Sequence, residues 1–78
     1  MELRHIRYFK AVAEEKNFTR AAEKLAIAQP PLSRQIQDLE EELGTELFVR
    51  SPHKVTLTEE GELFLQYASQ ILDLVSKS

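Results

Sequence analysis

The sequence predicts a mainly α fold in which three short helices and a small β-hairpin are followed by one long helix. Apolar residues recur at helical spacing in four separate segments, and two β-prone runs, at 47–50 and 55–57, flank a group of turn residues. A chain of 78 residues that is 42% hydrophobic and 29% charged suits one small folded domain. No apolar run approaches the roughly 18 residues of a membrane span, which favours a cytoplasmic location.

The formal net charge of −3 is unevenly distributed along the chain. Residues 1–37 hold seven Lys or Arg against four Glu, whereas residues 38–78 hold three Lys or Arg against nine Asp or Glu. A nucleic-acid backbone interacts with the local face presented to it, so a polyanionic partner is expected on the N-terminal half. The chain has no cysteine, which excludes disulfides and thiolate metal sites.

The first helix is expected over residues 2–15. Its apolar stripe consists of Leu3, Ile6, Phe9, Val12 and Ala13. Asn17 is expected to end it, because asparagine tolerates the left-handed conformation that commonly follows a helix. The second helix is expected over residues 19–25, with Thr19 as the N-cap that accepts a free backbone N–H. The small Ala22 allows this helix to cross another one closely.

A third helix is expected over residues 28–43, and it has two opposed faces. The apolar face consists of Leu32, Ile36, Leu39 and Leu43. The opposite face carries Pro30, Ser33, Arg34 and Gln37. Hydroxyl, guanidinium and amide groups read base edges in the major groove of DNA. A short helix, a tight turn and an amphipathic helix with a polar front predict a helix-turn-helix.

The C-terminal end of the third helix is acidic. Gly44 is expected to end the helix in the left-handed conformation. Asp38 and the run Glu40–Glu42 are unfavourable beside the negative end of the helix dipole. We therefore expect these carboxylates to be exposed, at an end of the helix that leaves the groove.

The two β-prone runs predict a hairpin, the wing of a winged helix-turn-helix. Residues 51–54 join the runs, and the tip carries Arg50, His53 and Lys54. The charged side chains of Arg50 and Lys54 are expected to reach phosphates or a narrow minor groove, although a charge at a hairpin tip is also commonly just solvated, and His53 is more simply a surface histidine.

The final helix is expected from Thr58, as its N-cap, to Val75. It is apolar over too wide an arc for a single packing surface. One stripe, predicted to pack on the domain, consists of Phe64, Ala68, Ile71 and Val75. The other side chains, Leu65, Leu72 and Leu74, are expected to face water in a monomer. This second surface predicts a homodimer formed through the last helix.

Three stretches carry a resemblance to the DNA-binding domain of LysR-type transcriptional regulators. They are LRHIRYFKAVAEEKNFTRAAEKL, QPPLSRQIQDLEEELGTELFVR and LTEEG, in this order. The resemblance implies a winged helix-turn-helix over residues 1–57 and a dimerisation or linker helix over 58–78. It also implies a dyad-symmetric DNA site, a bacterial cytoplasmic location at the nucleoid, and no cofactor. The larger effector-binding domain of the family, with its small-molecule effector and its role in tetramers, is absent from this chain.

The resemblance also assigns roles to residues. The family's base-reading positions match Gln29, Pro30, Pro31, Ser33, Arg34 and Gln37. Its backbone-contacting positions match Thr19, Arg20, Arg50, His53 and Lys54. The pair Pro30-Pro31 resembles the subgroup that controls breakdown of aromatic compounds such as benzoate and catechol. The tip sequence 51–54 departs from the arginine and glycine of many members, which leaves minor-groove contact by the wing open.

Simpler interpretations accompany several of these assignments. A polar helix face outside a helix-turn-helix is usually only solvated. Pro30 and Pro31 suit the first turn of any helix, where the missing N–H is not needed, as well as contact with a thymine methyl. Thr19 is either a helix cap or a phosphate contact.

Two other classes of protein compete with DNA binding. A winged-helix module that binds a protein would have a neutral or acidic helix front, which Arg34 and the basic N-terminal half disfavour. An enzyme would need a nucleophile–base pair, a carboxylate dyad or a metal cluster. The carboxylates of Glu40–Glu42 are expected to be exposed, and His5 has no second ligand at metal spacing. No catalytic or metal site is therefore predicted.

Overall fold

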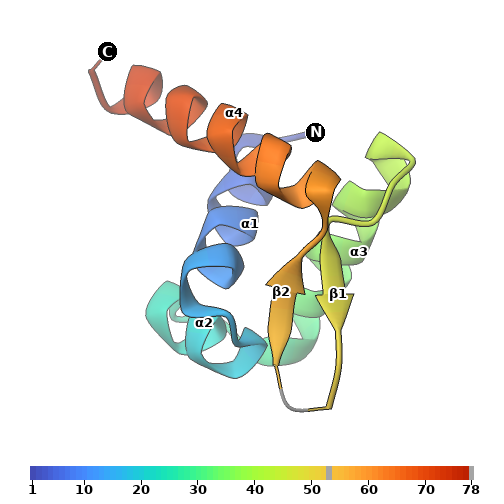
Figure 1. The fold of residues 1–78 in the computed structure, drawn as a ribbon. Coiled ribbons are helices and arrows are strands. Elements are labelled where there is room, and N and C mark those ends of the chain that lie inside the picture. Colours follow the sequence, from blue (N-terminus) through green and yellow to red (C-terminus); the bar gives the residue numbers. More distant parts are fainter. Residues whose placement is uncertain (53, 78) are drawn as a thin grey trace.

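The computed structural model describes residues 1–52 and 54–77, and it confirms the mainly α fold with a short hairpin (Figure 1). The elements follow the order α1 (Leu3–Glu15), α2 (Phe18–Leu25), α3 (Gln29–Leu43), β1 (Phe48–Arg50), β2 (Val55–Leu57) and α4 (Glu59–Lys77). Helices α1, α2 and α3 pack on one another, and α4 lies across α1 (Figure 1). Within the described part of the chain, no helix combines the length and apolar composition needed to cross a bilayer.

The junction between α1 and α2 differs from the sequence prediction. Lys16, not Asn17, takes the left-handed conformation, with φ of 54°, and its N–H donates to the Val12 carbonyl at 2.8 Å. Asn17 is instead the N-cap of α2, because its side-chain oxygen accepts from the Arg20 N–H at 2.9 Å. The prediction that Thr19 caps this helix is therefore wrong. Thr19 lies exposed in the first turn.

The turn between α2 and α3 is as tight as predicted. Ala26 has a φ of 59°, and the N–H of Ile27 donates to the Ala22 carbonyl at 3.0 Å. The side chain of Ile27 packs against the core. Pro30 and Pro31 lie in the first turn of α3, where their missing N–H groups cost no helical hydrogen bond.

Phe9 lies at the centre of the core and is fully buried. Its ring lies 4.9 Å from the ring of Phe64 and 5.2 Å from that of Phe48, measured between centroids. Phe48 is also 6.0 Å from Phe18. The four rings come from α1, α2, β1 and α4, so the aromatic cluster joins the wing to three helices. Each such pair contributes roughly 0.5–1.5 kcal/mol beyond the area that it buries.

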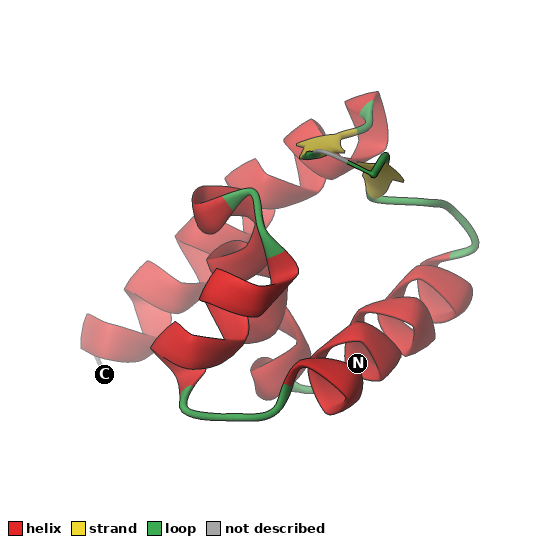
Figure 2. Ribbon diagram, turned by 90° about the horizontal axis from the view of Figure 1, so that it is seen from below, coloured by secondary structure: helices red, strands yellow, loops and turns green. Residues whose placement is uncertain are grey.

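The wing, which we define as β1, β2 and residues 51–54, is an antiparallel hairpin. Its register pairs Phe48 with Leu57 and Arg50 with Val55. The turn is closed by Ser51, whose N–H and hydroxyl both donate to the Lys54 carbonyl, at 3.1 and 2.8 Å. The predicted tip residue His53 lies outside the described residues. Figure 2 shows the hairpin next to the start of α4, with the loop after α3 leading into it.

The start of α4 is hydrogen-bonded to the residues that precede β1. The Thr58 hydroxyl accepts from the Gly61 N–H at 2.9 Å, which confirms the predicted cap, and it donates to the Glu46 carbonyl at 2.7 Å. The N–H of Thr58 donates to the Leu47 carbonyl at 3.0 Å. A Cβ on Gly61 would lie 2.1 Å from the same Leu47 oxygen. Glycine is therefore required for this close approach.

Helix α4 packs on the core over a wider arc than predicted, with Phe64, Ala68 and Ile71 in the expected contact. Its buried side is centred on Gly61 and Ala68, so Leu65 and Leu72 are half-buried against the core rather than facing water. Val75 is 36% exposed instead of buried. At 100° per residue it points in nearly the same direction as Ala68, but it lies two residues before the end of α4, and the C-terminal turns of that helix extend past the other elements (Figure 1). The apolar ridge of α4 that faces outward consists of Leu63, Tyr67 and Leu74.

Candidate nucleic-acid interface

The front face of α3, which we define as Gln29, Pro30, Ser33, Arg34 and Gln37, points away from the core. The opposite side of the helix is anchored by Leu32, Ile36 and Leu39, each with no exposed surface. Pro30, Arg34 and Gln37 are exposed, whereas Gln29 and Ser33 are half-buried. Pro31 is exposed as well. The predicted base-reading residues therefore lie on the accessible surface of one firmly packed helix.

Two front-face side chains are hydrogen-bonded to each other. The Gln29 amide nitrogen, Nε2, donates to Ser33 Oγ at 2.7 Å. The two residues are four positions apart, so they lie one above the other on the helix. The bond restricts the amide of Gln29 and leaves its carbonyl oxygen available to a ligand.

The front face continues into acidic residues. A shallow recess on the surface of α3 is lined by Arg34 and Gln37 together with Asp38 and Glu41. Both carboxylates are exposed, as predicted. They limit the part of the helix that a polyanion can approach to the N-terminal half.

Two exposed arginines, one on α2 and one within the front face of α3, are accessible to an anion. Arg20, in the first turn of α2, and Arg34 are both exposed. Among residues 1–52 and 54–77, neither forms an ion pair with a carboxylate. By contrast, Lys24 lies 3.6 Å from carboxylate oxygens of both Glu14 and Glu15. On α2, the charge of Lys24 is therefore compensated within the protein, whereas the Arg20 guanidinium, with Thr19 beside it, has no such partner among the described residues.

Arg50 has partners within the protein that the sequence did not predict. One of its terminal guanidinium nitrogens lies 3.3 Å from Glu40 Oε1, and the guanidinium carbon lies 5.1 Å from the centre of the Phe18 ring. Its side chain remains 36% exposed. Lys54, at the other end of the tip, is exposed and has no carboxylate partner within the described part of the chain.

Glu40 is not exposed, which corrects the prediction for the run Glu40–Glu42. Its side chain is only 12% exposed, and its Oε2 accepts from the N–H groups of Leu47 at 2.7 Å and Phe48 at 3.2 Å. A sequence signal for this burial does exist. Glu40 follows Ile36 by four positions and therefore borders the apolar stripe.

His5 has a structural role at the start of α1. It is 9% exposed, and its Nδ1 accepts from the Glu2 N–H at 3.0 Å. This bond and the reciprocal one from the His5 N–H to the Glu2 side chain form a capping box. Across the described ranges 1–52 and 54–77, no group of three His, Cys, Asp or Glu side chains is arranged to hold a metal ion.

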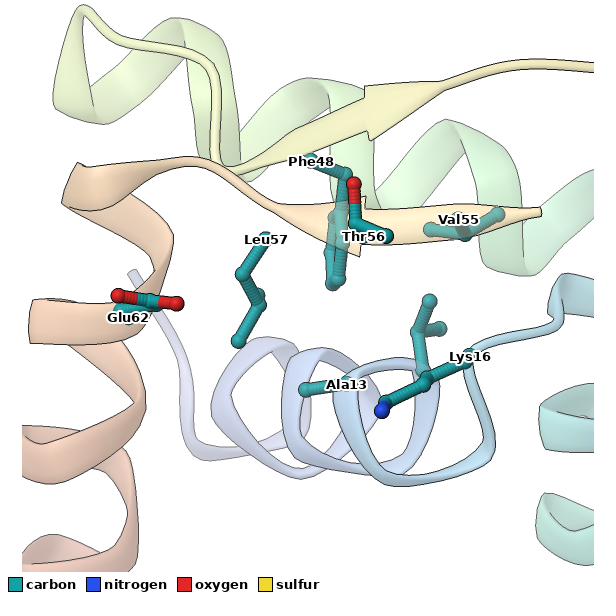
Figure 3. A pocket seen from close by; sticks show the side chains of 8 residues that line it. Ala13, Lys16, Phe48, Val55, Thr56, Leu57 and Glu62 are labelled. Atoms are coloured by element: carbon teal, nitrogen blue, oxygen red, sulfur yellow. The ribbon is translucent and has the colours of Figure 1, made fainter.

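A cavity of about 270 Å³ lies between α1, the wing and α4 (Figure 3). Its walls are mainly apolar and include Ala13, Val55 and Leu57, with Lys16 and Glu62 at the sides (Figure 3). No lining residue belongs to α2 or α3, so the cavity is separate from the front face of α3. Its volume is also below the roughly 300–1,000 Å³ of typical ligand pockets.

A winged helix-turn-helix with an exposed polar front helix and adjacent free arginines defines a class of DNA-binding regulatory domains. Residues 3–62 match the family described as "Bacterial regulatory helix-turn-helix protein, lysR family". The chain therefore belongs to the LysR family of regulators, which confirms the sequence prediction.

Several relatives resemble the chain over nearly its whole length. It is 61% identical over 77 residues to the transcriptional regulator BenM of Acinetobacter baylyi, and 60% identical over 74 residues to CatR of Pseudomonas putida. These alignments cover 99% and 95% of this chain but 25% of each relative. The chain thus spans about a quarter of the length of these curated relatives.

Solved structures agree with the fold. The BenM DNA-binding domain in complex with catB site 1 DNA superposes with a TM-score of 0.96 at 61% identity, covering 99% of this chain and 86% of that one. The CbnR DNA-binding domain in its DNA complex gives a TM-score of 0.96 at 45% identity, covering 99% and 88%. Both neighbours are winged helix-turn-helix domains bound to DNA, which supports the assignment of the fold.

Proposed function

We propose that this chain binds double-stranded DNA sequence-specifically, with α3 in the major groove, as part of a bacterial transcriptional regulator. The observation that carries the proposal is the front face of α3, where Pro30, Arg34 and Gln37 are exposed on a helix whose opposite side is fully buried. Arg34 can donate two hydrogen bonds to a guanine. Gln29 and Gln37 suit adenine, and the proline rings suit a thymine methyl.

In the proposed orientation, a second set of residues would lie near the DNA backbone. Arg20 and Thr19 lie at the start of α2, where phosphate ligands of a helix-turn-helix are expected. On the wing we assign the flanking phosphates to Arg50 and Lys54, with His53 retained as a candidate from the sequence. These contacts position the domain and account for affinity rather than for sequence preference.

We further propose that two copies associate through α4. The apolar ridge of Leu63, Tyr67 and Leu74 lies outside the core, with these side chains 53%, 53% and 69% exposed. Leu74 belongs to the predicted dimer surface, whereas Leu65 and Leu72 would support that surface from the core side. A homodimer would place two α3 helices in successive major grooves of a dyad-symmetric site.

The remaining assignments concern the full-length protein. The Pro30-Pro31 pair resembles the subgroup that regulates aromatic-compound breakdown, so we propose target genes of that kind. Residues 1–57 act as the DNA-binding unit and 58–78 as the linker and dimerisation helix. The effector site and any tetramer interface would belong to a larger domain outside this chain, and the whole would act at the bacterial nucleoid in the cytoplasm.

Selection of bound duplexes from a random pool tests the proposal. We expect enrichment of one sequence with dyad symmetry and with half-sites about one helical turn apart. Affinity for the enriched duplex should fall steeply with added salt, since several phosphates are neutralised. A module that binds only protein partners would enrich no sequence, and that result would overturn the proposal. Enrichment of a single half-site would retain DNA binding but reject the dimer.

A further inference from the structure

The Glu40 carboxylate joins α3 to the wing. Its Oε2 accepts from the backbone N–H groups of Leu47 and Phe48, at 2.7 and 3.2 Å, where β1 begins. Its Oε1 accepts from the guanidinium of Arg50, at the end of the same strand, at 3.3 Å. One side chain therefore holds both ends of β1 against the helix that carries the front face.

Arg50 is held from a second side. Its guanidinium lies over the ring of Phe18 on α2, at 5.1 Å from the centroid, and that ring packs in turn against Phe48. A guanidinium has five N–H donors in a rigid plane. The bond to Glu40 uses one nitrogen, and the side chain is 36% exposed. Donors remain for an external acceptor in a direction that Glu40 and Phe18 fix.

We propose that Glu40 is a positioning residue for DNA binding, which sets the wing relative to α3 and orients Arg50 toward a backbone phosphate. The inference rests on the proposed function. From charge alone, removal of the Glu40 carboxylate would be expected to strengthen DNA binding, because a carboxylate close to DNA repels the phosphates. The carboxylate strengthens binding through the geometry that it imposes, and this gain exceeds its repulsion.

Glu41 provides a matched control. It is the next residue of α3 and carries the same charge, but it is exposed. Its side chain has no hydrogen bond or ion pair with the described residues of the wing. Loss of this carboxylate changes the charge near the DNA without changing the position of the wing. Glu41→Gln is therefore expected to bind DNA as tightly as the unsubstituted chain, or more tightly.

The test measures affinity by fluorescence anisotropy, with the duplex most enriched in the selection described above, over a series of salt concentrations. We expect Glu40→Gln and Glu40→Ala to weaken binding by roughly tenfold, the equivalent of about 1.4 kcal/mol. Loss of one phosphate contact should also reduce the slope of log K against log[salt] by about 0.9. Glu40→Gln keeps an oxygen that can accept from the backbone, so this variant is expected to fold even where Glu40→Ala does not.

A double-mutant cycle with Arg50→Ala shows whether Glu40 acts through the arginine. We expect Glu40→Gln to cause little further loss in the Arg50→Ala background. Glu40→Gln affinity equal to that of Glu41→Gln, with an unchanged salt slope, would overturn the inference while DNA binding by the unsubstituted chain stands. A Glu40 variant that loses only thermal stability, with the same salt slope when folded, would overturn it as well. If no duplex is enriched at all, the proposed function itself fails.

Discussion

The front face of α3 and the wing both present an arginine toward the proposed DNA, but they hold it differently. Arg34 projects from a helix whose buried side fixes it, and its guanidinium has no ion-pair partner among the described residues. Arg50 projects from a three-residue strand and is held by Glu40 and Phe18. A helix that is fixed by its buried side needs no further contact to hold its arginine. A three-residue strand has no buried side of that extent, so its arginine is held by residues of α3 and α2.

Disruption of the close contact between Gly61 of α4 and the Leu47 carbonyl, which lies just before β1, should have the largest effect. Gly61→Ala places a methyl group 2.1 Å from the carbonyl oxygen of Leu47, so α4 or the start of β1 must move. We expect a loss of about 3 kcal/mol in the free energy of unfolding, at the upper end of the usual cost of overpacking. Urea denaturation followed by circular dichroism measures this loss.

Gly44→Ala is the control for that substitution. Gly44 has a φ of 72°, but a Cβ there meets no atom within 4 Å. Only the left-handed conformation is penalised, at roughly 1–2 kcal/mol. Equal losses at Gly44 and Gly61 would show that backbone conformation, and not the close approach of α4 to the wing, limits both positions.

The second effect concerns the front face of α3. Arg34→Ala should reduce the difference in binding free energy between the selected duplex and a scrambled one by about 2 kcal/mol, the middle of the range for a bidentate base contact. Stability should change little, because Arg34 is exposed and has no ion pair in the described part of the chain. Competition binding at fixed salt measures this difference. A variant that keeps full discrimination would remove Arg34 from the set of base-reading residues.

The contrast between the two regions also explains what the sequence could predict. The helices and the two faces of α3 follow from local periodicity, since residues such as Leu32 and Ile36 recur at spacings that only a helix brings onto one side. The alternation of turn and β-prone residues predicted the hairpin in the same way. The family was predicted from the residues as well, and the comparisons confirm it.

Features that depend on tertiary contacts could not be predicted from the sequence. Asn17 and Thr19 are both good N-cap residues, and only the position of the first turn selects Asn17. Glu40 was grouped with its exposed neighbours, because its burial depends on the place where β1 returns to α3. The packing of Leu65 and Leu72 against the core, beyond the predicted stripe of α4, is likewise a tertiary contact, as is the close approach of Gly61 to Leu47. The roles of the predicted DNA-contacting residues stay predictions.

The smallest effect is expected for the hydrogen bond within the front face. Ser33→Ala removes the acceptor of the 2.7 Å bond from Gln29 and frees that amide to rotate. Alanine favours a helix more than serine does, so stability should be unchanged or slightly higher. Discrimination at the base pair read by Gln29 should fall by about 0.5 kcal/mol, the lower limit for a neutral hydrogen bond.

Competition binding against duplexes altered at single positions measures this effect, and Ser33→Thr is the control because it keeps the hydroxyl. The effect should disappear in a Gln29→Ala background, since Ser33 then has no amide to hold. A loss as large as that of Arg34→Ala would instead mean that the Ser33 hydroxyl contacts DNA directly. In that case Ser33 would act as a base-reading residue itself, as the family resemblance predicts, and not as a support for the amide of Gln29.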